Sequence, residues 1–328
     1  MDGKRCVGID VSAYEITVAI AGRPGRTTLP NDAAGHAQLV RQLARGKSVA
    51  RVCLEATGIY HLDLALALHR AEHTEVMVVN PTAARDFGRA LMQRSKTDRV
   101  DAGVLLTYAE RMPFVGWQPP APEILDLRAI VRRMGALTLT RTQERNRLHA
   151  AGHCAELTEA IAWDIEAHLE HLAQSLERLE AQALAIVTAS PELARRFARL
   201  VSVRGIATTS GLRILAELAV LPADMTARQW VAHAGLDPRQ LDSGTSLHKP
   251  ARISKKGNRH LRAALYMPAL VAAREEPNVR GFYQHRIARG LKPLQALVAI
   301  ERKLLHAIYG MWTSDTDFEG KRFYAEAA

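Results

Sequence analysis

Over the first 117 residues, the hydrophobic positions alternate between short strand-like runs and helical ones. Residues 6–9 and 16–20 are predicted to form two strands joined as a hairpin, and residues 49–54 and 76–79 are apolar runs typical of buried strands. Apolar residues at helical spacing predict helices over residues 35–46, 61–71, 81–93 and 100–111. Strands that first pair and then alternate with helices indicate a mixed α/β sheet.

A proline cluster at residues 119–122 ends this pattern, and the chain beyond it is predicted to be mainly helical. Between residues 165 and 186, apolar residues follow a 4-3-4-3 spacing, which predicts a coiled coil of about three heptads. A helical hairpin packed within one chain is the alternative. Residues 191–314 carry several turn signals and are expected to form short helices joined by loops.

The expected organisation therefore has four parts, and the first is a compact α/β domain. They are residues 1–118 (α/β domain), 119–190 (helical linker or coiled coil for oligomerisation), 191–314 (mainly α C-terminal domain) and 315–328 (a polar tail expected to fray).

Composition narrows the choice of partner. The formal net charge of +10 and a pI near 9.8 favour a polyanion. No stretch approaches the ~20 apolar residues of a membrane helix, which disfavours a membrane partner. The three cysteines lack metal-ligand spacing and are expected to be core thiols, so a reducing cytoplasm is the predicted setting.

Four carboxylates stand where an α/β fold usually builds a site. Asp10 and Glu55 each close a predicted strand, and Asp98 and Asp101 share one face of a predicted helix because they are three residues apart. Gathered carboxylates repel unless a hard cation neutralises them, and oxygen ligands suit Mg²⁺, or Mn²⁺ as an alternative. Taken singly, each could instead be a cap or a surface ion-pair partner.

A basic segment follows a serine in the C-terminal part. Ser243 precedes a glycine in a polar stretch, a permissive geometry for an exposed hydroxyl, although spacing identifies no base to activate it. Six cations and no acid follow it: Lys249, Arg252, Lys255, Lys256, Arg259 and Arg262. Such density suits phosphate, and the turn at Gly257 would let backbone amides approach an oxyanion. A solvated basic loop is the alternative.

These motifs together resemble the DEDD transposases of insertion-sequence family one-ten, also called bridge recombinases, and the related site-specific DNA invertases. The resemblance spans nearly the whole chain. Its elements are Gly8-Ile9-Asp10, Glu55-Ala56-Thr57-Gly58, Asn80-Pro81, Lys96-Thr97-Asp98, Val100-Asp101-Ala102, Ala234-Gly235-Leu236, Ser243-Gly244 and Arg262 to Pro268.

The resemblance implies a RuvC-like RNase H fold for the first domain, with Asp10, Glu55, Asp98 and Asp101 as the Mg²⁺-binding tetrad. It implies that Ser243 is the nucleophile that forms a phosphoserine intermediate with DNA. It also implies donor and target DNA as partners, a noncoding guide RNA in some members, and a homo-oligomer, dimer or tetramer, in which the serine of one subunit meets the carboxylates of another. The expected location is the bacterial cytoplasm, at the nucleoid during the reaction.

One motif departs from the family. Where the family commonly has a Pro-Gly-Ile-Gly turn resembling a helix-hairpin-helix DNA contact, this chain has residues 203–207, Val-Arg-Gly-Ile-Ala, and the missing second glycine disfavours close phosphate approach there. Three other functions remain open: a DNA invertase with the same chemistry, an RNase H-like nuclease with no covalent step, and a non-catalytic nucleic-acid-binding protein.

Overall fold

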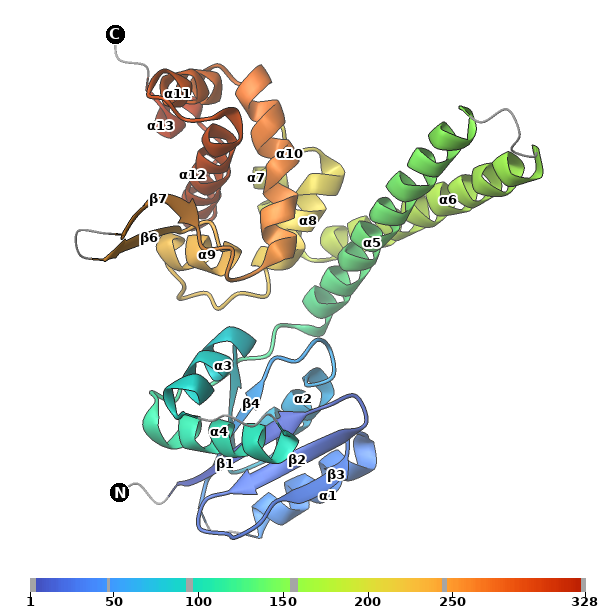
Figure 1. Ribbon diagram of the computed structural model, residues 1–328. Helices are drawn as coiled ribbons and strands as arrows, with labels where there is room; N and C mark the ends of the chain where they lie inside the picture. The colour runs from blue at the N-terminus through green and yellow to red at the C-terminus, as the bar shows by residue number, and fades with distance from the viewer. Residues whose placement is uncertain (1–3, 46–47, 93–96, 154–158, 244–246, 326–328) are drawn as a thin grey trace. The chain divides into compact units, whose positions relative to one another are not determined.

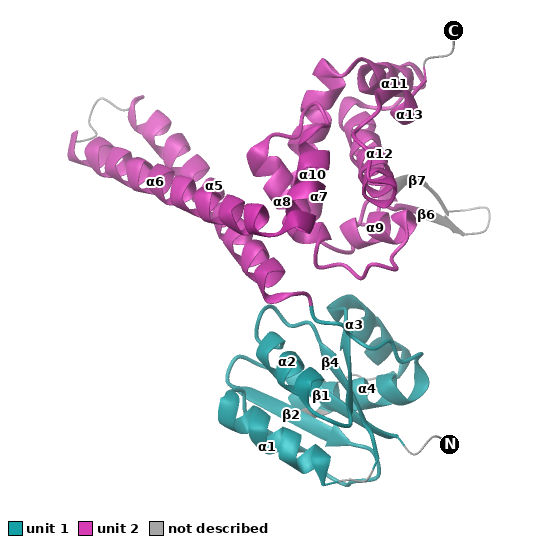
Figure 2. Ribbon diagram, turned by 180° about the vertical axis from the view of Figure 1, so that it is seen from behind, with its two compact units in different colours: residues 1–119 teal, residues 120–328 magenta. Residues whose placement is uncertain are grey.

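The computed structural model describes the chain except residues 1–3, 46–47, 93–96, 154–158, 244–246 and 326–328. It divides into two compact units, Met1–Pro119 (unit 1) and Pro120–Ala328 (unit 2), which Figure 2 shows in different colours. Unit 1 is α/β and unit 2 is mostly helical, which confirms the fold class expected from the hydrophobic pattern. The finer boundaries expected at residues 190 and 314 stay predictions.

Unit 1 is built on a five-stranded sheet with the order β3-β2-β1-β4-β5. The strands are β1 (Arg5–Val11), β2 (Glu15–Ile20), β3 (Thr27–Pro30), β4 (Ala50–Glu55) and β5 (Thr74–Val79). β1, β2 and β3 pair antiparallel, while β1, β4 and β5 pair parallel. β3 was not predicted, because this short edge strand buries only Leu29 and ends in proline.

The helices of unit 1 are α1 (Ala33–Ala44), α2 (Leu62–Arg70), α3 (Pro81–Ala90) and α4 (Asp98–Arg111). Three of them begin where a side chain accepts a backbone N–H: Asp32 for α1, Asn80 for α3 and Thr97 for α4. The two faces of the sheet carry separate cores. One joins strand residues to α1 and α2, and the other joins Cys53 and Met77 to α3 and α4.

Unit 2 begins with two long helices, α5 (Pro122–Ala151) and α6 (Glu159–Ala189), which pack side by side in both views (Figures 1 and 2). Ala183 and Val187 of α6 share a core with Leu127 and Met134 of α5. The apolar stripe of α6 is thus covered, at least in part, within the chain, as the helical-hairpin alternative requires. A role for this segment in oligomerisation stays a prediction.

The rest of unit 2 is helical apart from one hairpin. It comprises α7 (Pro191–Val201), α8 (Thr208–Leu218), α9 (Ala227–Ala234), β6 (Pro238–Ser243), β7 (Leu247–Ile253), α10 (Arg259–Glu275), α11 (Pro277–Ala288), α12 (Pro293–Ser314) and α13 (Gly320–Phe323). β6 and β7 form an antiparallel pair. This hairpin corrects the expectation of loops in this region. Across the described ranges, no helix has the length and apolar character needed to cross a membrane.

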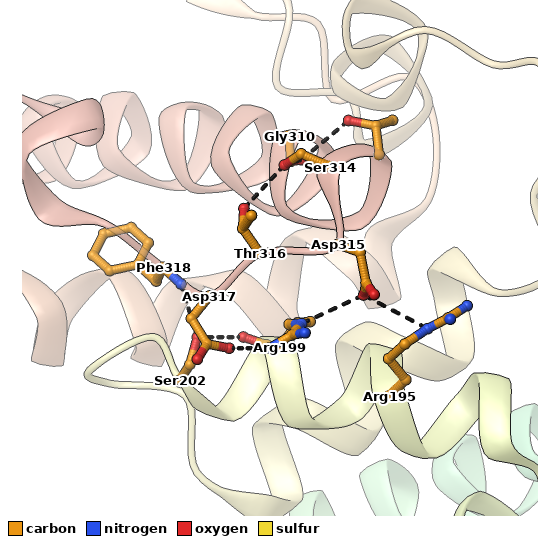
Figure 3. A network of polar contacts seen from close by, with 10 residues as sticks. Arg195, Arg199, Ser202, Gly310, Ser314, Asp315, Thr316, Asp317 and Phe318 are labelled. Carbon is orange, nitrogen blue, oxygen red and sulfur yellow. Dashed lines mark hydrogen bonds and ion pairs between the residues drawn. The ribbon is translucent and has the colours of Figure 1, made fainter.

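Residues 315–325 are packed against the helices of unit 2, which corrects the expectation that this polar part of the tail frays. Asp317 accepts a hydrogen bond from Arg199 of α7 at 2.7 Å, and Asp315 pairs with Arg195 and Arg199 (Figure 3). Phe323 is buried against Phe282. The tail looks polar by composition, yet Phe323 and the two acids tie it to the helices.

The two described cysteines, Cys6 and Cys53, are free thiols. Cys53 is buried, and burial raises its pKa to about 12, as expected of a core thiol. Cys154 lies outside the described residues.

Candidate active site

Asp10 and Glu55 lie side by side at the carboxyl ends of two neighbouring parallel strands. Asp10 is the penultimate residue of β1 and Glu55 is the last of β4, and the register pairs Ile9 with Leu54 immediately before them. Side chains alternate between faces along a strand, so both carboxylates share the face of Gly8 and not that of buried Ile9. The sequence correctly predicted both strand ends.

Helix α4 crosses this same face, and Gly8 is the reason that it can. A Cβ at Gly8 would lie 2.1 Å from the backbone N of Leu106 and 2.3 Å from the carbonyl O of Ala102. Two residues earlier on β1, the Cys6 thiol lies 3.6 Å from the carbonyl O of Ala109. α4 therefore runs antiparallel to β1, and its first turn lies over the end of the strand that carries Asp10 (Figure 1).

That first turn carries the other two carboxylates. Asp98 and Asp101 both lie within it, as their spacing predicted, and Thr97 caps the helix by accepting the N–H of Val100. An α-helix presents a partial positive charge and unpaired N–H groups at its amino end, which favour nearby anions. The helix end therefore offsets part of the repulsion among the acids that surround it.

The electrostatics of Asp10 report how closely the four acids converge. The pKa of the half-buried Asp10 is raised to about 6, first by burial and then by the charges of Asp101, Asp98 and Glu55, while the N–H of Val11 opposes the shift. In the described part of the chain, no three His, Cys, Asp or Glu side chains are gathered closely enough to hold a metal ion. The charges of the four acids thus affect one another, but the side chains are not close enough together to bind one metal ion as they stand.

The cluster fits a hard divalent cation by its chemistry. All four side chains offer oxygen only, and the repulsion that raises the pKa of Asp10 is what a bound cation would relieve. Closing the carboxylates on an ion would need movement of these side chains.

Exposed aromatic residues follow the two strands that carry Asp10 and Glu55, and the sequence pattern did not single them out. Tyr14 follows β1 and is 86% exposed, and Tyr60 follows β4 and is 49% exposed. The side-chain amide of Asn31 joins the two turns by donating to the carbonyls of Ser12 (2.7 Å) and Tyr60 (3.1 Å). Aromatic residues a few positions after each acidic strand end were the available signal.

Ser243 is the last residue of β6, and its backbone pairs with Leu247 of β7. This corrects its expected place in a loop. Lys249 lies in β7 opposite Leu241. The side chains of residues 240–251 lie outside the described part of the structure, so the surroundings of the Ser243 hydroxyl stay a prediction.

The base of the hairpin is tied to α9 by short polar contacts. The Ser254 hydroxyl donates to a carboxylate oxygen of Asp237 at 2.5 Å, and the N–H of Lys255 donates to the carbonyl of Gly235 at 3.1 Å. Lys255 has a φ of +53°, in the left-handed region. These contacts tie the middle of the basic segment, at Ser254 and Lys255, to the residues that follow α9.

The turn at Gly257 serves packing in this structure. A Cβ there would lie 2.2 Å from the carbonyl O of His233, and the next N–H, that of Asn258, donates to that same oxygen at 2.6 Å. The expected approach of an oxyanion to this turn is therefore corrected, because a carbonyl of the chain already occupies it. Gly205 behaves similarly, since its Cβ would lie 2.8 Å from the carbonyl O of Pro268.

A buried polar network holds the amino end of α10. Asn258 caps this helix and donates to Glu217 at 2.7 Å, and Arg132 donates to both oxygens of Glu217 at 2.7 and 2.9 Å. Burial would raise the pKa of Glu217, yet the hydrogen bonds from Arg132 and Asn258 outweigh it and the pKa is lowered. The network joins α5, α8 and α10.

The predicted nucleic-acid contacts differ in exposure. Arg252, Lys255, Lys256 and Arg259 are exposed, as a phosphate contact requires. Arg262 is half-buried and donates to the carbonyl of Ala234 at 2.7 Å, so it supports the carboxyl end of α9. A nucleic-acid contact by each of these cations stays a prediction.

Two protein-family models match the parts of the sequence that carry these residues. The sequence matches a family described as "Transposase" over residues 7–151, which includes all four carboxylates. It matches "Transposase IS116/IS110/IS902 family" over residues 197–284, which includes Ser243 and the basic segment. The chain belongs to this insertion-sequence transposase family.

Relatives of this transposase include proteins of two kinds. The "Pilin gene-inverting protein" of Moraxella bovis is 28% identical over 83% of each chain, and that of Moraxella lacunata is 29% identical over 83% of each. The "Insertion element IS110 uncharacterized 43.6 kDa protein" of Streptomyces coelicolor is 32% identical over 44% of this chain and 34% of its own. The protein is a DNA transposase or recombinase, and its substrate is DNA.

Proposed function

We propose that this transposase cleaves and rejoins DNA through a phosphoserine intermediate, with Asp10, Glu55, Asp98 and Asp101 as a Mg²⁺-binding tetrad and Ser243 as the nucleophile. The observation that supports this most directly is the convergence of the four acids around the first turn of α4, seen in the raised pKa of Asp10. An RNase H-like, RuvC-like fold of unit 1 belongs to the proposal, and the mixed five-stranded sheet supports it.

The carboxylates bind and orient. Mg²⁺ or Mn²⁺ bound to their oxygens would supply the positive charge that polarises a phosphodiester. Asp10 and Glu55 come from strands held in a sheet, so they are rigidly placed, and Asp98 and Asp101 are brought to them by the packing of α4 on Gly8. The exposed Tyr14 and Tyr60, which follow the strands of Asp10 and Glu55, would stack on the bases or sugars of the bound strand.

Ser243 conserves the energy of the broken bond. Its hydroxyl oxygen forms a bond to phosphorus, and a deoxyribose oxygen leaves with a proton, so one phosphoester replaces another. The reverse attack by a different DNA end then reseals the strand without an external energy source. Because the tetrad lies in unit 1 and the serine in unit 2, we propose that a homo-oligomer, a dimer or tetramer, brings the two together across subunits.

The remaining cations and partners complete the proposal. The exposed Arg252, Lys255, Lys256 and Arg259 would contact nucleic-acid backbone, and donor DNA, target DNA and a noncoding guide RNA are the proposed partners. Inversion of a DNA segment is a second candidate, which the two pilin gene-inverting relatives favour. Both use the same chemistry and differ in the arrangement of the DNA sites.

The test is a denaturing-gel assay for a covalent protein–DNA adduct on element-junction DNA, with Mg²⁺ and any transcript of the flanking DNA. We expect an adduct with the wild type and none with Ser243→Ala or Asp101→Asn. Ser246→Ala, in the same stretch, and Asp164→Asn, on the exposed surface of α6, are the matched controls that should keep it.

The other outcomes distinguish the alternatives. Cleavage without an adduct that persists in Ser243→Ala would identify a metal-dependent nuclease without a covalent step. Loss of the adduct in Ser246→Ala but not in Ser243→Ala would move the nucleophile to the other serine. DNA binding with unchanged activity in Asp101→Asn would remove the tetrad from the mechanism.

A further inference from the structure

A cavity of about 750 Å³ in unit 2 is lined by residues from the base of the β6–β7 hairpin and from helices α11 and α12. Five cations line it, and the lining includes no Asp or Glu. They are Arg252, Lys255, Arg286, Arg302 and Lys303. Three come from α11 and α12, 24 to 41 residues beyond Arg262, so the cavity extends the basic segment into a site the linear sequence does not show.

The acids of the described residues do not balance the charges of this cavity. In the described parts of the structure, none of the five forms a salt bridge with a carboxylate. The Nε of Arg286 is buried without a hydrogen-bond partner. Burial, and then the charge of Arg286, lower the pKa of Lys303. Unpaired cations held this close favour an anionic ligand that would neutralise them.

Two of the five cations, Arg286 and Lys303, lie over an aromatic ring. The guanidinium carbon of Arg286 lies 4.7 Å, and the Nζ of Lys303 4.5 Å, from the centre of the buried Phe282 ring. Cation–π contacts of this kind limit the freedom of long side chains. Both side chains line the cavity and are held against Phe282, and the Nζ of Lys303 also lies 5.1 Å from the ring centre of Phe323.

Apart from Gln295 and His306, the rest of the cavity lining is apolar, and this distinguishes between kinds of anionic ligand. Leu236, Ile253, Leu291, Leu294 and Val298 contribute to its lining, and Leu294 is 60% exposed. Duplex DNA keeps its bases stacked inside and offers phosphates to a flat basic surface. A single strand offers phosphates together with an unstacked base, which gains by lying on an apolar or aromatic surface. The mixed lining matches the single strand.

We propose that this cavity binds a segment of single-stranded nucleic acid, with phosphates on the five cations and an unstacked base against Leu294 and Val298. The site is separate from the proposed nucleophile. Pro238, in its lining, and Ser243 are the first and last residues of β6, about 17 Å apart in an extended strand. The cavity would hold a strand beside the hairpin, and this inference does not depend on the role of Ser243.

The test measures binding of short labelled oligonucleotides to the full-length protein by fluorescence anisotropy. The probes are single-stranded oligo-dT, oligo-U and a duplex, across a range of salt. For the double variant Arg286→Gln/Arg302→Gln we expect roughly tenfold weaker binding of single strands, a salt slope for them smaller by about 1.4, and little change for the duplex. Leu294→Ser should weaken single-strand binding several-fold without changing the salt slope, because it removes an apolar contact and no charge.

Arg289→Gln and Lys292→Gln, combined, are the matched control, since both residues are exposed, lie between α11 and α12 and do not line the cavity. Equal losses in this control and the double variant would overturn the proposal, because binding would then follow net charge. Equal losses for duplex and single strand would also overturn it. A preference for oligo-U or for oligo-dT upholds it and identifies the strand as RNA or DNA.

Discussion

Replacing Gly8 by alanine tests whether α4 must lie directly on β1 for the carboxylates to converge. The added Cβ would lie 2.1 Å from the backbone N of Leu106, whereas ordinary contacts begin at 3.4 Å. The backbone N of Leu106 and the carbonyl O of Ala102 both belong to the backbone of α4, so no side-chain rotation can relieve the clash. The helix must move outward by about 1.3 Å, the difference between those two distances.

The shift has one cost in stability and another in activity. Overpacking of this kind costs about 1–3 kcal/mol of the free energy of unfolding. Asp98 and Asp101 move with the helix while Asp10 and Glu55 stay in the sheet, and a displacement near 1 Å at a reacting centre costs about 100-fold in rate. We expect Gly8→Ala to fold with reduced stability and to form the DNA adduct about 100-fold more slowly.

Urea denaturation and the adduct assay measure the two effects. Gly88→Ala is the matched control, because its Cβ would meet Val104 at 3.5 Å, an ordinary contact, within α3. Alanine in place of a helical glycine should stabilise by roughly 0.5–1 kcal/mol. Wild-type stability and adduct formation in Gly8→Ala would refute the argument that the close packing of α4 builds the site.

Three further predictions concern buried or crowded acids. Burial raises the pKa of Glu301 to about 7, although the charge of Arg262 opposes the shift. The folded state therefore favours the protonated carboxyl, and the free energy of unfolding falls as pH rises from 4.5, the ordinary pKa, to 7. Glu301→Gln should therefore raise the free energy of unfolding by about 3 kcal/mol near pH 8 and by almost nothing near pH 4, measured by urea denaturation at both. Glu217→Ala should cost roughly 3 kcal/mol, because it leaves Arg132 and Asn258 without their shared acceptor, and a melting curve unchanged from wild type would contradict this. In EDTA near pH 8, Asp10→Asn should stabilise unit 1 by about 1–2 kcal/mol, because it removes a charged carboxylate whose pKa is raised to about 6. The same variant should be stabilised less by added Mg²⁺ than the wild type. Equal thermal shifts with Mg²⁺ in both proteins would exclude Asp10 as a ligand.

The local pattern of the chain was sufficient for most of unit 1. Residues 49–54 and 76–79 were recognised as buried strands because continuous β-type apolar runs have few other stable places, and β4 and β5 occupy nearly the same ranges. The spacing of three between Asp98 and Asp101 was enough to predict that both acids share one helix face. β1 and β4 end at or within one residue of an acid, and these acids were also visible in the linear sequence.

The hairpin of β6 and β7 could not be predicted from the local sequence pattern. Its residues lack the alternation that marks a half-buried strand, and a two-stranded ribbon with polar residues is stabilised by what it packs on. The same limit applies to the residues after Ser314, where Asp315 and Asp317 found arginines more than 100 residues away in the chain.

The sequence by itself determined the helices of unit 1, its strands other than β3, the four acids and the basic character of the chain, because these depend on neighbours a few residues apart. Only the tertiary structure decided that α4 runs antiparallel to β1 over Gly8, which brings Asp101 to Asp10, and that Arg286 and Lys303 join Arg252 around one cavity. Contacts between distant segments depend on which surfaces pack together. No periodicity along a single segment carries that information.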